Sequence, residues 1–232
     1  MFYLKLTTDF HWSIIYKINA KARLNCFYQT CTSFPAVLIQ PLLQIKFLSQ
    51  LCCVPKYFFA VLPTTTILNE IIAFQREIEA NFGSVHAQKT PPHITIIPPF
   101  DCGEEKLWDF TEKTSLFLTD KSIIDLKIYL DNFQCFDGRT LFIDVAKNEP
   151  FEKLCKELKL LFNQQKITKQ RVEKHFFIPH ITIANKDIKK RDFRIASEDF
   201  KKRNYQRSFD LKTLAVLELV EEKWVVKTTI TF

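Results

Sequence analysis

Apolar and polar residues follow regular patterns over residues 56–232. Short apolar runs, or strict alternation of apolar and polar residues, predict strands, whereas apolar residues three or four positions apart predict helices. The strands expected on this basis cover 57–62, 93–97, 126–130, 141–145, 180–184, 211–219 and 224–230. The expected helices cover 68–82, 104–118, 150–162 and 197–203.

Turn and cap residues support several of these boundaries. Gly83 follows the last apolar residue of the first helix and is suited to the left-handed conformation in which helices often end. Asn148 can cap the third helix, which has Pro150 in its first turn. Asp137 and Gly138 stand between two alternating runs, so they predict a tight hairpin turn and an antiparallel strand pair.

Residues 1–55 have a different character. They contain five basic residues and a single acidic one, and so carry more than half of the formal charge of +7. Their apolar stretch, 33–54, is interrupted by prolines and a lysine, whereas a membrane-spanning helix needs about 20 cleaner apolar residues. We interpret 1–55 as an atypical N-terminal extension and 56–232 as the functional domain. The extension could be a targeting leader, a disordered segment or an over-long gene model, and we prefer the last.

Composition adds little to this picture. The seven cysteines show no paired spacing apart from the adjacent Cys52 and Cys53, which indicates a reducing compartment. A reducing compartment is consistent with a cytoplasmic location. We also expect a monomer without stable membrane association. A pI near 9.0 is compatible with a polyanionic ligand such as nucleic acid, but it does not identify one.

A Pro-His-Ile-Thr-Ile segment occurs twice, at 92–96 and 179–183. Side chains in a strand alternate between the two faces of the sheet, so His93 and Thr95 share one face while the isoleucines share the other. The same holds for His180 and Thr182. Each copy therefore predicts a buried apolar face and a polar face with one imidazole and one hydroxyl, and the repeat suggests two similar lobes.

These four polar side chains would suit a phosphodiester if the two strands faced each other across a cleft. An imidazole, with an unperturbed pKa near 6.5, acts as a base when neutral and as an acid when charged. Two imidazoles can therefore serve both ends of a displacement at phosphorus. Threonine hydroxyls can donate hydrogen bonds to the non-bridging oxygens, which gain charge in the transition state. This scheme requires no metal ion.

Other candidate residues lack a comparable context. The remaining histidines, His11, His86 and His175, have no carboxylate or cysteine at the spacing usual for metal ligands, so we expect no metal site. Core packing is the simplest interpretation of any one phenylalanine in a chain that has 23 of them. Three phenylalanines near the repeats could nevertheless stack on a nucleobase: Phe100, Phe176 and Phe177.

The repeated pattern of His-x-Thr followed by an apolar residue resembles the two-histidine (2H) phosphoesterase superfamily. That superfamily includes the 2′-5′ RNA ligase-like proteins and the RNA 2′,3′-cyclic phosphodiesterases. The resemblance covers the order of elements over 56–232 and implies a bilobal α+β fold, in which two pseudo-symmetric antiparallel-sheet lobes with outer helices enclose a central cleft. It also implies that His93 and His180 are catalytic and that Thr95 and Thr182 bind phosphate.

The activity that this resemblance implies is a metal-independent and cofactor-independent phosphodiesterase. Its substrates would be RNA ends that carry a 2′,3′-cyclic phosphate or a 2′-5′ phosphodiester, or cyclic nucleotides. One histidine would activate water and the other would protonate the departing ribose oxygen, but the sequence does not assign the two roles. Two alternatives stay open: a non-catalytic module that binds RNA ends or nucleotides, and a phosphodiesterase of a small nucleotide metabolite.

Overall fold

The computed structural model describes residues 2–7, 13–18, 54–120, 126–136, 140–168, 171–172 and 178–232. The chain divides into two compact units, Met1–Cys52 and Cys53–Phe232. In the first unit, β1 (Phe2–Thr7) pairs antiparallel with β2 (Ser13–Ile18), although the sequence pattern predicted no strand there. Residues 33–53 of the interrupted apolar stretch lie outside the described residues. None of the helices in the described ranges is long and apolar enough to cross a membrane.

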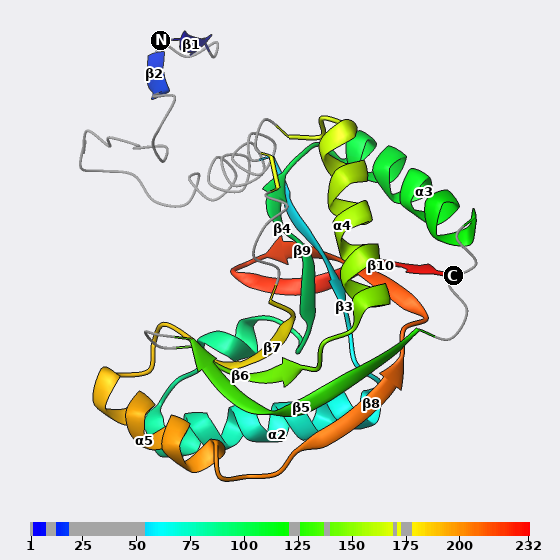
Figure 1. Ribbon diagram of the computed structural model, residues 1–232. Coiled ribbons are helices and arrows are strands. Elements are labelled where there is room, and N and C mark those ends of the chain that lie inside the picture. Colours follow the sequence, from blue (N-terminus) through cyan, green and yellow to red (C-terminus); the bar gives the residue numbers. More distant parts are fainter. Residues whose placement is uncertain are drawn as a thin grey trace, which may run out of the picture. The chain divides into compact units, whose positions relative to one another are not determined.

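The second unit is built on one antiparallel sheet of eight strands in the order β10-β9-β3-β4-β7-β6-β5-β8 (Figure 1). Its strands are β3 (Lys56–Val61), β4 (Ile94–Asp101), β5 (Lys127–Phe136), β6 (Thr140–Val145), β7 (His180–Ala184), β8 (Gln206–Asp210), β9 (Thr213–Val220) and β10 (Lys223–Thr231). The strands β4 and β7, which carry the two repeats, are neighbours at the centre and pair through Ile94 and Ile181. This junction separates two four-stranded halves: lobe A (β10-β9-β3-β4) and lobe B (β7-β6-β5-β8).

Among the described residues four helices cover the lobes, and two of them pack against the lobe to which their neighbouring strands do not belong. The helices are α2 (Thr65–Phe82), α3 (Glu104–Asp120), α4 (Glu149–Gln164) and α5 (Lys190–Phe200). Helix α2 connects two strands of lobe A but packs against β7 of lobe B, and α4 connects two strands of lobe B but packs against β4 of lobe A. Helix α3 contacts β10, and α5 contacts β5. The predicted α+β fold with two similar lobes is confirmed, and the two lobes share one sheet.

Helix ends follow the predicted signals. Gly83 ends α2 in the left-handed conformation, with φ of 69°, and its N–H donates to the carbonyl of Glu79 at 2.8 Å. The side chain of Asn148 caps α4 by accepting a hydrogen bond from the N–H of Phe151 at 3.0 Å. Pro150 lies in the first turn, where backbone N–H groups have no partner within the helix, so the N–H that proline lacks is not needed there.

Three local predictions need correction or lie outside the description. The last helix, expected at 197–203, is α5 and begins at Lys190, so the basic run 189–191 forms its start. Basic residues are unfavourable at a helix N-terminus, but Ala196 and Phe200 are buried on one face of α5 and its packing outweighs that cost. Strand β8 was not expected because Phe209 is its only buried residue. The expected hairpin turn at 137–139 lies outside the described residues.

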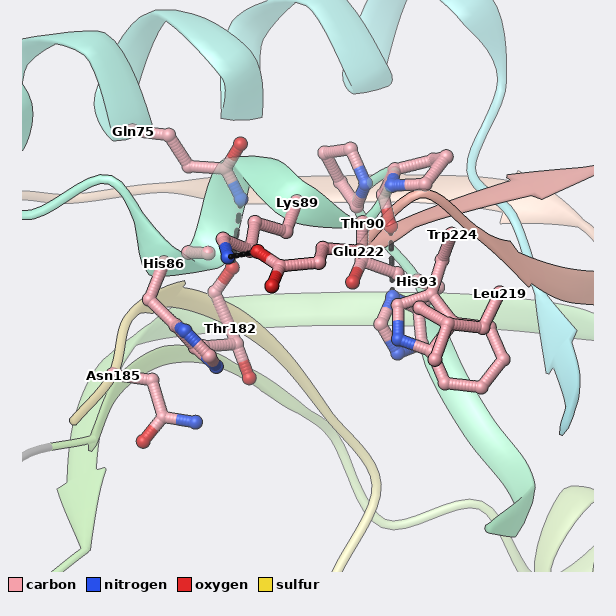
Figure 2. A pocket seen from close by; sticks show the side chains of 13 residues that line it. Gln75, His86, Lys89, Thr90, His93, Thr182, Asn185, Leu219, Glu222 and Trp224 are labelled. Atoms are coloured by element: carbon pink, nitrogen blue, oxygen red, sulfur yellow. Dashed lines mark hydrogen bonds and ion pairs between the residues drawn. The ribbon is translucent and has the colours of Figure 1, made fainter. Parts of the chain in front are cut away.

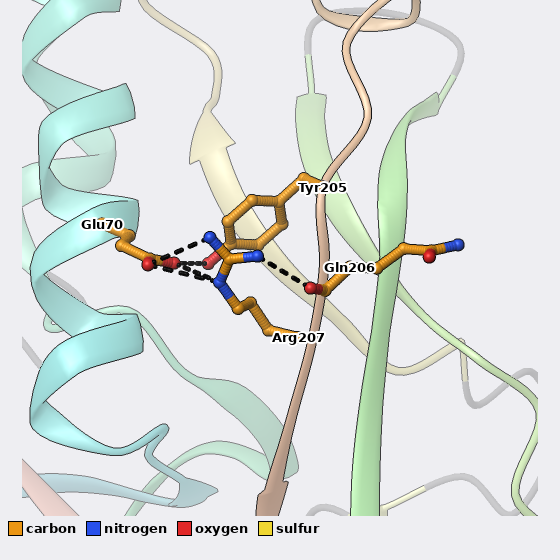
Figure 3. Close-up of polar contacts among 4 residues, drawn as sticks. All are labelled: Glu70, Tyr205, Gln206 and Arg207. Carbon is orange, nitrogen blue, oxygen red and sulfur yellow. Dashed lines mark hydrogen bonds and ion pairs between the residues drawn. The ribbon is translucent and has the colours of Figure 1, made fainter.

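Polar contacts tie α2 to the outer strand of lobe B (Figure 3). The carboxylate of Glu70 accepts hydrogen bonds from the Tyr205 hydroxyl at 2.8 Å and from Nε of Arg207 at 2.9 Å. Nearer the middle of the sheet, the buried amide of Gln75 donates to the carbonyl of Thr182 at 3.1 Å. Helix α2 therefore supports the strand that carries the second repeat.

The two faces of the sheet have different surroundings. The isoleucines of both repeats are buried within the main core, which the helices complete: Ile94, Ile96, Ile181 and Ile183. On lobe A, a smaller apolar cluster forms separately from this core. It consists of Phe58, Ala60, Ala215 and Leu217 with Trp224 packed against it. The polar side chains of the repeats belong to the face that the helices do not cover.

Candidate functional site

The junction of β4 and β7 brings the two repeats together. Because Ile94 pairs with Ile181 in antiparallel register, extending the register by one residue in each direction sets His93 opposite Thr182. The same extension sets Thr95 opposite His180. Directly opposed side chains lie on one face of a sheet, so all four polar side chains share a face, and all four are half-buried.

This arrangement differs from two strands that face each other across a cleft. The strands lie edge to edge, and the two imidazoles are diagonal neighbours in the register. Diagonal neighbours in an antiparallel pair are about 7–8 Å apart between Cα atoms, a separation within reach of long side chains. A single phosphate group placed over the junction can therefore be contacted from both strands.

Each imidazole has the same orientation relative to its own strand. Nδ1 of His93 lies 2.7 Å from the carbonyl oxygen of Pro91, and Nδ1 of His180 lies 2.8 Å from that of Ile178. A carbonyl oxygen only accepts hydrogen bonds, so Nδ1 must carry the proton in both rings. In the neutral state Nε2 of each ring is then unprotonated and available as a base.

Aromatic rings pack against both imidazoles in matching positions. The ring of Phe58, on the strand beside β4, lies 4.9 Å from that of His93. The ring of Phe142, on the strand beside β7, lies 5.0 Å from that of His180, and Phe136 contacts the same imidazole edge-on at 5.0 Å. These contacts restrict the rotation of both imidazoles.

The two imidazoles differ in their electrostatic surroundings. Burial is the main cause that lowers the pKa of His93 to about 4; the hydrogen bond to Pro91 opposes this shift, and the positive charge of His180 adds to it. Burial also lowers the pKa of His180, but the hydrogen bond to Ile178 and the negative charge of Asp144 oppose this. Asp144 lies opposite His180 on β6. Because of this carboxylate, the protonated form is favoured more at His180 than at His93.

A pocket of about 410 Å³ opens beside the first repeat (Figure 2). It lies between the start of β4, the short 3-10 helix η1 (His86–Lys89) and the turn that joins β9 to β10. His93 and Thr182 are among its lining residues. Its other lining residues are Gln75, His86, Ala87, Lys89, Thr90, Pro91, Pro92, Asn185, Leu219, Glu222 and Trp224. The hydrophobic side of the pocket is formed by Leu219 and Trp224 near His93.

An ion pair and a group of three hydrogen bonds hold the rim of this pocket. The ammonium group of Lys89 pairs with the carboxylate of Glu222 at 3.0 Å and so joins η1 to the turn between β9 and β10. The carboxylate of Asp187 accepts hydrogen bonds from the Ser84 hydroxyl at 2.6 Å and from the N–H groups of Val85 and His86 at 2.7 Å each. The segment after β7 therefore anchors the segment that leads to His93.

The other predicted residues are placed as follows. Thr95 and His180 do not line this pocket. Residues 173–177, which precede the second repeat and include His175, Phe176 and Phe177, lie outside the described residues. His11 also lies outside them. Phe100 is buried in the core, with its ring 4.7 Å from that of Phe162, so it is unavailable for base stacking.

Sequence reasoning missed several pocket residues. Asn185 directly follows the second repeat, and its position could have drawn attention to it. His86 and Gln75 carry no local signal, because the fold and not their neighbours in sequence brings them to the pocket.

The described residues offer little support for other chemistries. Among them, no group of three or more histidine, cysteine or acidic side chains is placed to hold a metal ion. Burial raises the pKa of the Cys102 thiol to about 11, so this thiol is not a ready nucleophile near neutral pH.

Comparisons with known proteins identify the family of this chain. The family model described as the 2′-5′ RNA ligase superfamily matches residues 67–223. The chain is 27% identical over 179 residues to OB1230 of Oceanobacillus iheyensis, whose name assigns it provisionally as a phosphoesterase. This match covers 75% of the chain and 96% of the relative.

Solved structures share the fold at low sequence identity. TT0787 of Thermus thermophilus is 16% identical, with a TM-score of 0.55 over 76% of this chain and 97% of the other. LigT of Escherichia coli, solved in complex with 3′-AMP, is 16% identical, with a TM-score of 0.51 over 77% of this chain and 98% of the other. Both matches cover nearly the whole of the related chains.

Proposed function

The chain belongs to the 2′-5′ RNA ligase superfamily of two-histidine phosphoesterases, and we propose that it is a phosphodiesterase that acts on RNA ends through His93 and His180. Family membership supports a phosphodiesterase-type function. The bonds that we propose it cleaves are those of 2′,3′-cyclic phosphates or 2′-5′ phosphodiesters. Thr95 and Thr182 bind the phosphate in this proposal, and the proton transfers need no metal ion.

The observation that carries the proposal is the matched orientation of the two imidazoles. Nδ1 of each ring donates to the carbonyl two residues earlier, so both rings have Nε2 free for proton transfer. A binding site alone would not need two titratable groups in the same orientation on paired strands. Hydrolysis of a phosphodiester needs both a base and an acid.

The difference in pKa favours one assignment of roles. His93, whose pKa is about 4, is neutral near pH 7 and acts as the base, whereas Asp144 favours the charged form of His180, which acts as the acid. Nε2 of His93 takes a proton from water as the water oxygen bonds to phosphorus. The bond from phosphorus to one ribose oxygen breaks, and Nε2–H of His180 protonates that oxygen. The cyclic diester becomes a monoester, and the two hydroxyls donate to its non-bridging oxygens.

A nucleotide substrate is supported by two observations. LigT of Escherichia coli, which shares the fold, was solved with 3′-AMP. The pocket beside His93 also has an aromatic ring, that of Trp224, on its apolar side, where a nucleobase could pack.

A panel of phosphodiester substrates tests this function. The purified protein should hydrolyse nucleoside 2′,3′-cyclic phosphates and short RNAs that end in them, at the same rate with and without EDTA. Identification of the product as the 2′- or the 3′-phosphate would show which bond is cut. Binding of these compounds without turnover at any pH from 4 to 9, a range chosen to span the unperturbed histidine pKa, would instead indicate a binding module.

A further inference from the structure

The pocket beside His93 has a polar end that the proposed reaction does not use. Figure 2 shows His86 and Asn185 beside Thr182, whereas Trp224 and Leu219 lie near His93 at the other end. His86 comes from η1, and Asn185 comes directly after β7. Two segments far apart in sequence therefore supply this end of the pocket.

Hydrogen-bond donors predominate at the polar end. The Thr140 hydroxyl donates to Oδ1 of Asn185 at 3.0 Å. This hydrogen bond fixes the orientation of the amide, so that its NH₂ group points away from Thr140. Figure 2 shows that this nitrogen is directed into the pocket. Within the part of the chain that the structure describes, the imidazole of His86 has no hydrogen-bond partner.

The backbone that carries His86 is firmly held. Asp187 accepts a hydrogen bond from the N–H of His86 itself and two more from the residues before it. Burial alone would raise the pKa of Asp187, but these hydrogen bonds hold it below its usual value, so the carboxylate is charged near neutral pH. Because Asp187 follows Asn185 closely in the chain, the same short segment positions both donors.

A pair of side chains with free N–H donors beside a phosphate site suits an anion. Lys89 adds a positive charge at the same rim, and its partner Glu222 is 84% exposed, so a stronger anion can compete for the ammonium group. We propose that His86 and Asn185 bind a second phosphate of the substrate, one that the enzyme does not cleave.

On a terminal cyclic nucleotide, this second phosphate is the one attached to the 5′ oxygen. In an RNA end, the phosphodiester that links the preceding nucleotide occupies this same position. The inference rests on the proposed function and refines its substrate: the site selects the end of an oligonucleotide over a cyclic mononucleoside phosphate.

The test compares kcat/KM for adenosine 2′,3′-cyclic phosphate with that for the same compound bearing a 5′-phosphate. Wild-type protein should prefer the 5′-phosphorylated compound by about 10- to 100-fold, the range expected for hydrogen bonds to a charged group. His86→Ala should reduce this preference toward one. Asn185→Asp, which keeps the bond from Thr140 but places a negative charge in the pocket, should abolish or reverse it. Lys190→Ala, at an exposed position at the start of α5, controls for a general loss of positive charge and should keep the preference.

The possible outcomes separate the two proposals. Failure of the wild-type protein to hydrolyse either compound would overturn the proposed function. Hydrolysis of both at equal kcat/KM, or a preference that survives in both His86→Ala and Asn185→Asp, would overturn the second phosphate site while the phosphodiesterase assignment stands.

A measurement on the wild-type protein alone covers the case of a variant that fails to fold. Adenosine 2′,5′-bisphosphate should inhibit at a concentration at least about tenfold lower than adenosine 2′-phosphate does, and equal inhibition would contradict the site.

Discussion

His93 and His180 have equivalent positions in two copies of one pentapeptide, yet their surroundings favour different protonation states. Burial lowers the pKa of both, while Asp144 is present only beside His180 to favour its charged form. Enzymes commonly obtain an acid and a base from one residue type by such differences in environment. The sequence shows the repeat but not this asymmetry, because Asp144 reaches His180 only through the pairing of β6 with β7.

The pH dependence of kcat/KM should reflect this asymmetry. Activity requires neutral His93 and protonated His180, so kcat/KM should rise as pH increases through about 4 and fall as pH passes the pKa of His180, below 6.5. Asp144→Asn removes the charge that raises the pKa of His180 and should move the alkaline limb to lower pH. An alkaline limb that does not move in Asp144→Asn would contradict the assignment of His180 as the acid.

Local sequence was sufficient for the repeat residues but not for the second phosphate site. Alternation within five residues is a local property, and within each repeat it placed the histidine and the threonine on the same face of their strand. His86 reaches the pocket because Asp187, far along the chain, fixes the backbone of η1. No periodicity could have indicated that contact.

Among the elements, those with strong apolar periodicity or clear end signals were predicted well. The turn of Gly83 and the cap of Asn148 are local backbone effects, so the end of α2 and the start of α4 agree with expectation, whereas α2 begins three residues earlier than expected. Strand β8 and the first turns of α5 were missed because most of their residues are exposed. Their structure depends on contacts with β5, which sequence pattern does not reveal.

The cap of α4 makes a prediction about stability. Besides accepting from the N–H of Phe151, Asn148 donates through Nδ2 to the carbonyl of Lys127 at 2.7 Å. Asn148→Ala should lower the free energy of unfolding by about 0.5–2 kcal/mol, as measured by urea denaturation. Asn148→Asp keeps the capping acceptor and should cost less. Equal losses in the two variants would show that the contact with Lys127, and not the cap, is the stabilising interaction.

At the scale of the whole molecule, the two lobes are joined where the two repeats meet. The exchange of α2 and α4 between lobes gives each repeat strand a helix from the other half of the chain. The family resemblance predicted two lobes, but local pattern could not predict that β4 and β7 are neighbours in one sheet through the pair of Ile94 with Ile181. That pairing is what sets the two histidines on a common face.

The central claim is that these two histidines form one catalytic unit. Its most direct test is the rate of hydrolysis of a nucleoside 2′,3′-cyclic phosphate by wild-type protein, His93→Ala, His180→Ala and the double variant, with folding checked by circular dichroism. Each single variant should lose about 10²–10⁴ in kcat. The double variant should be little slower than the slower single one, because groups that act together are not additive. A folded His93→Ala or His180→Ala variant that keeps the wild-type rate would contradict the claim.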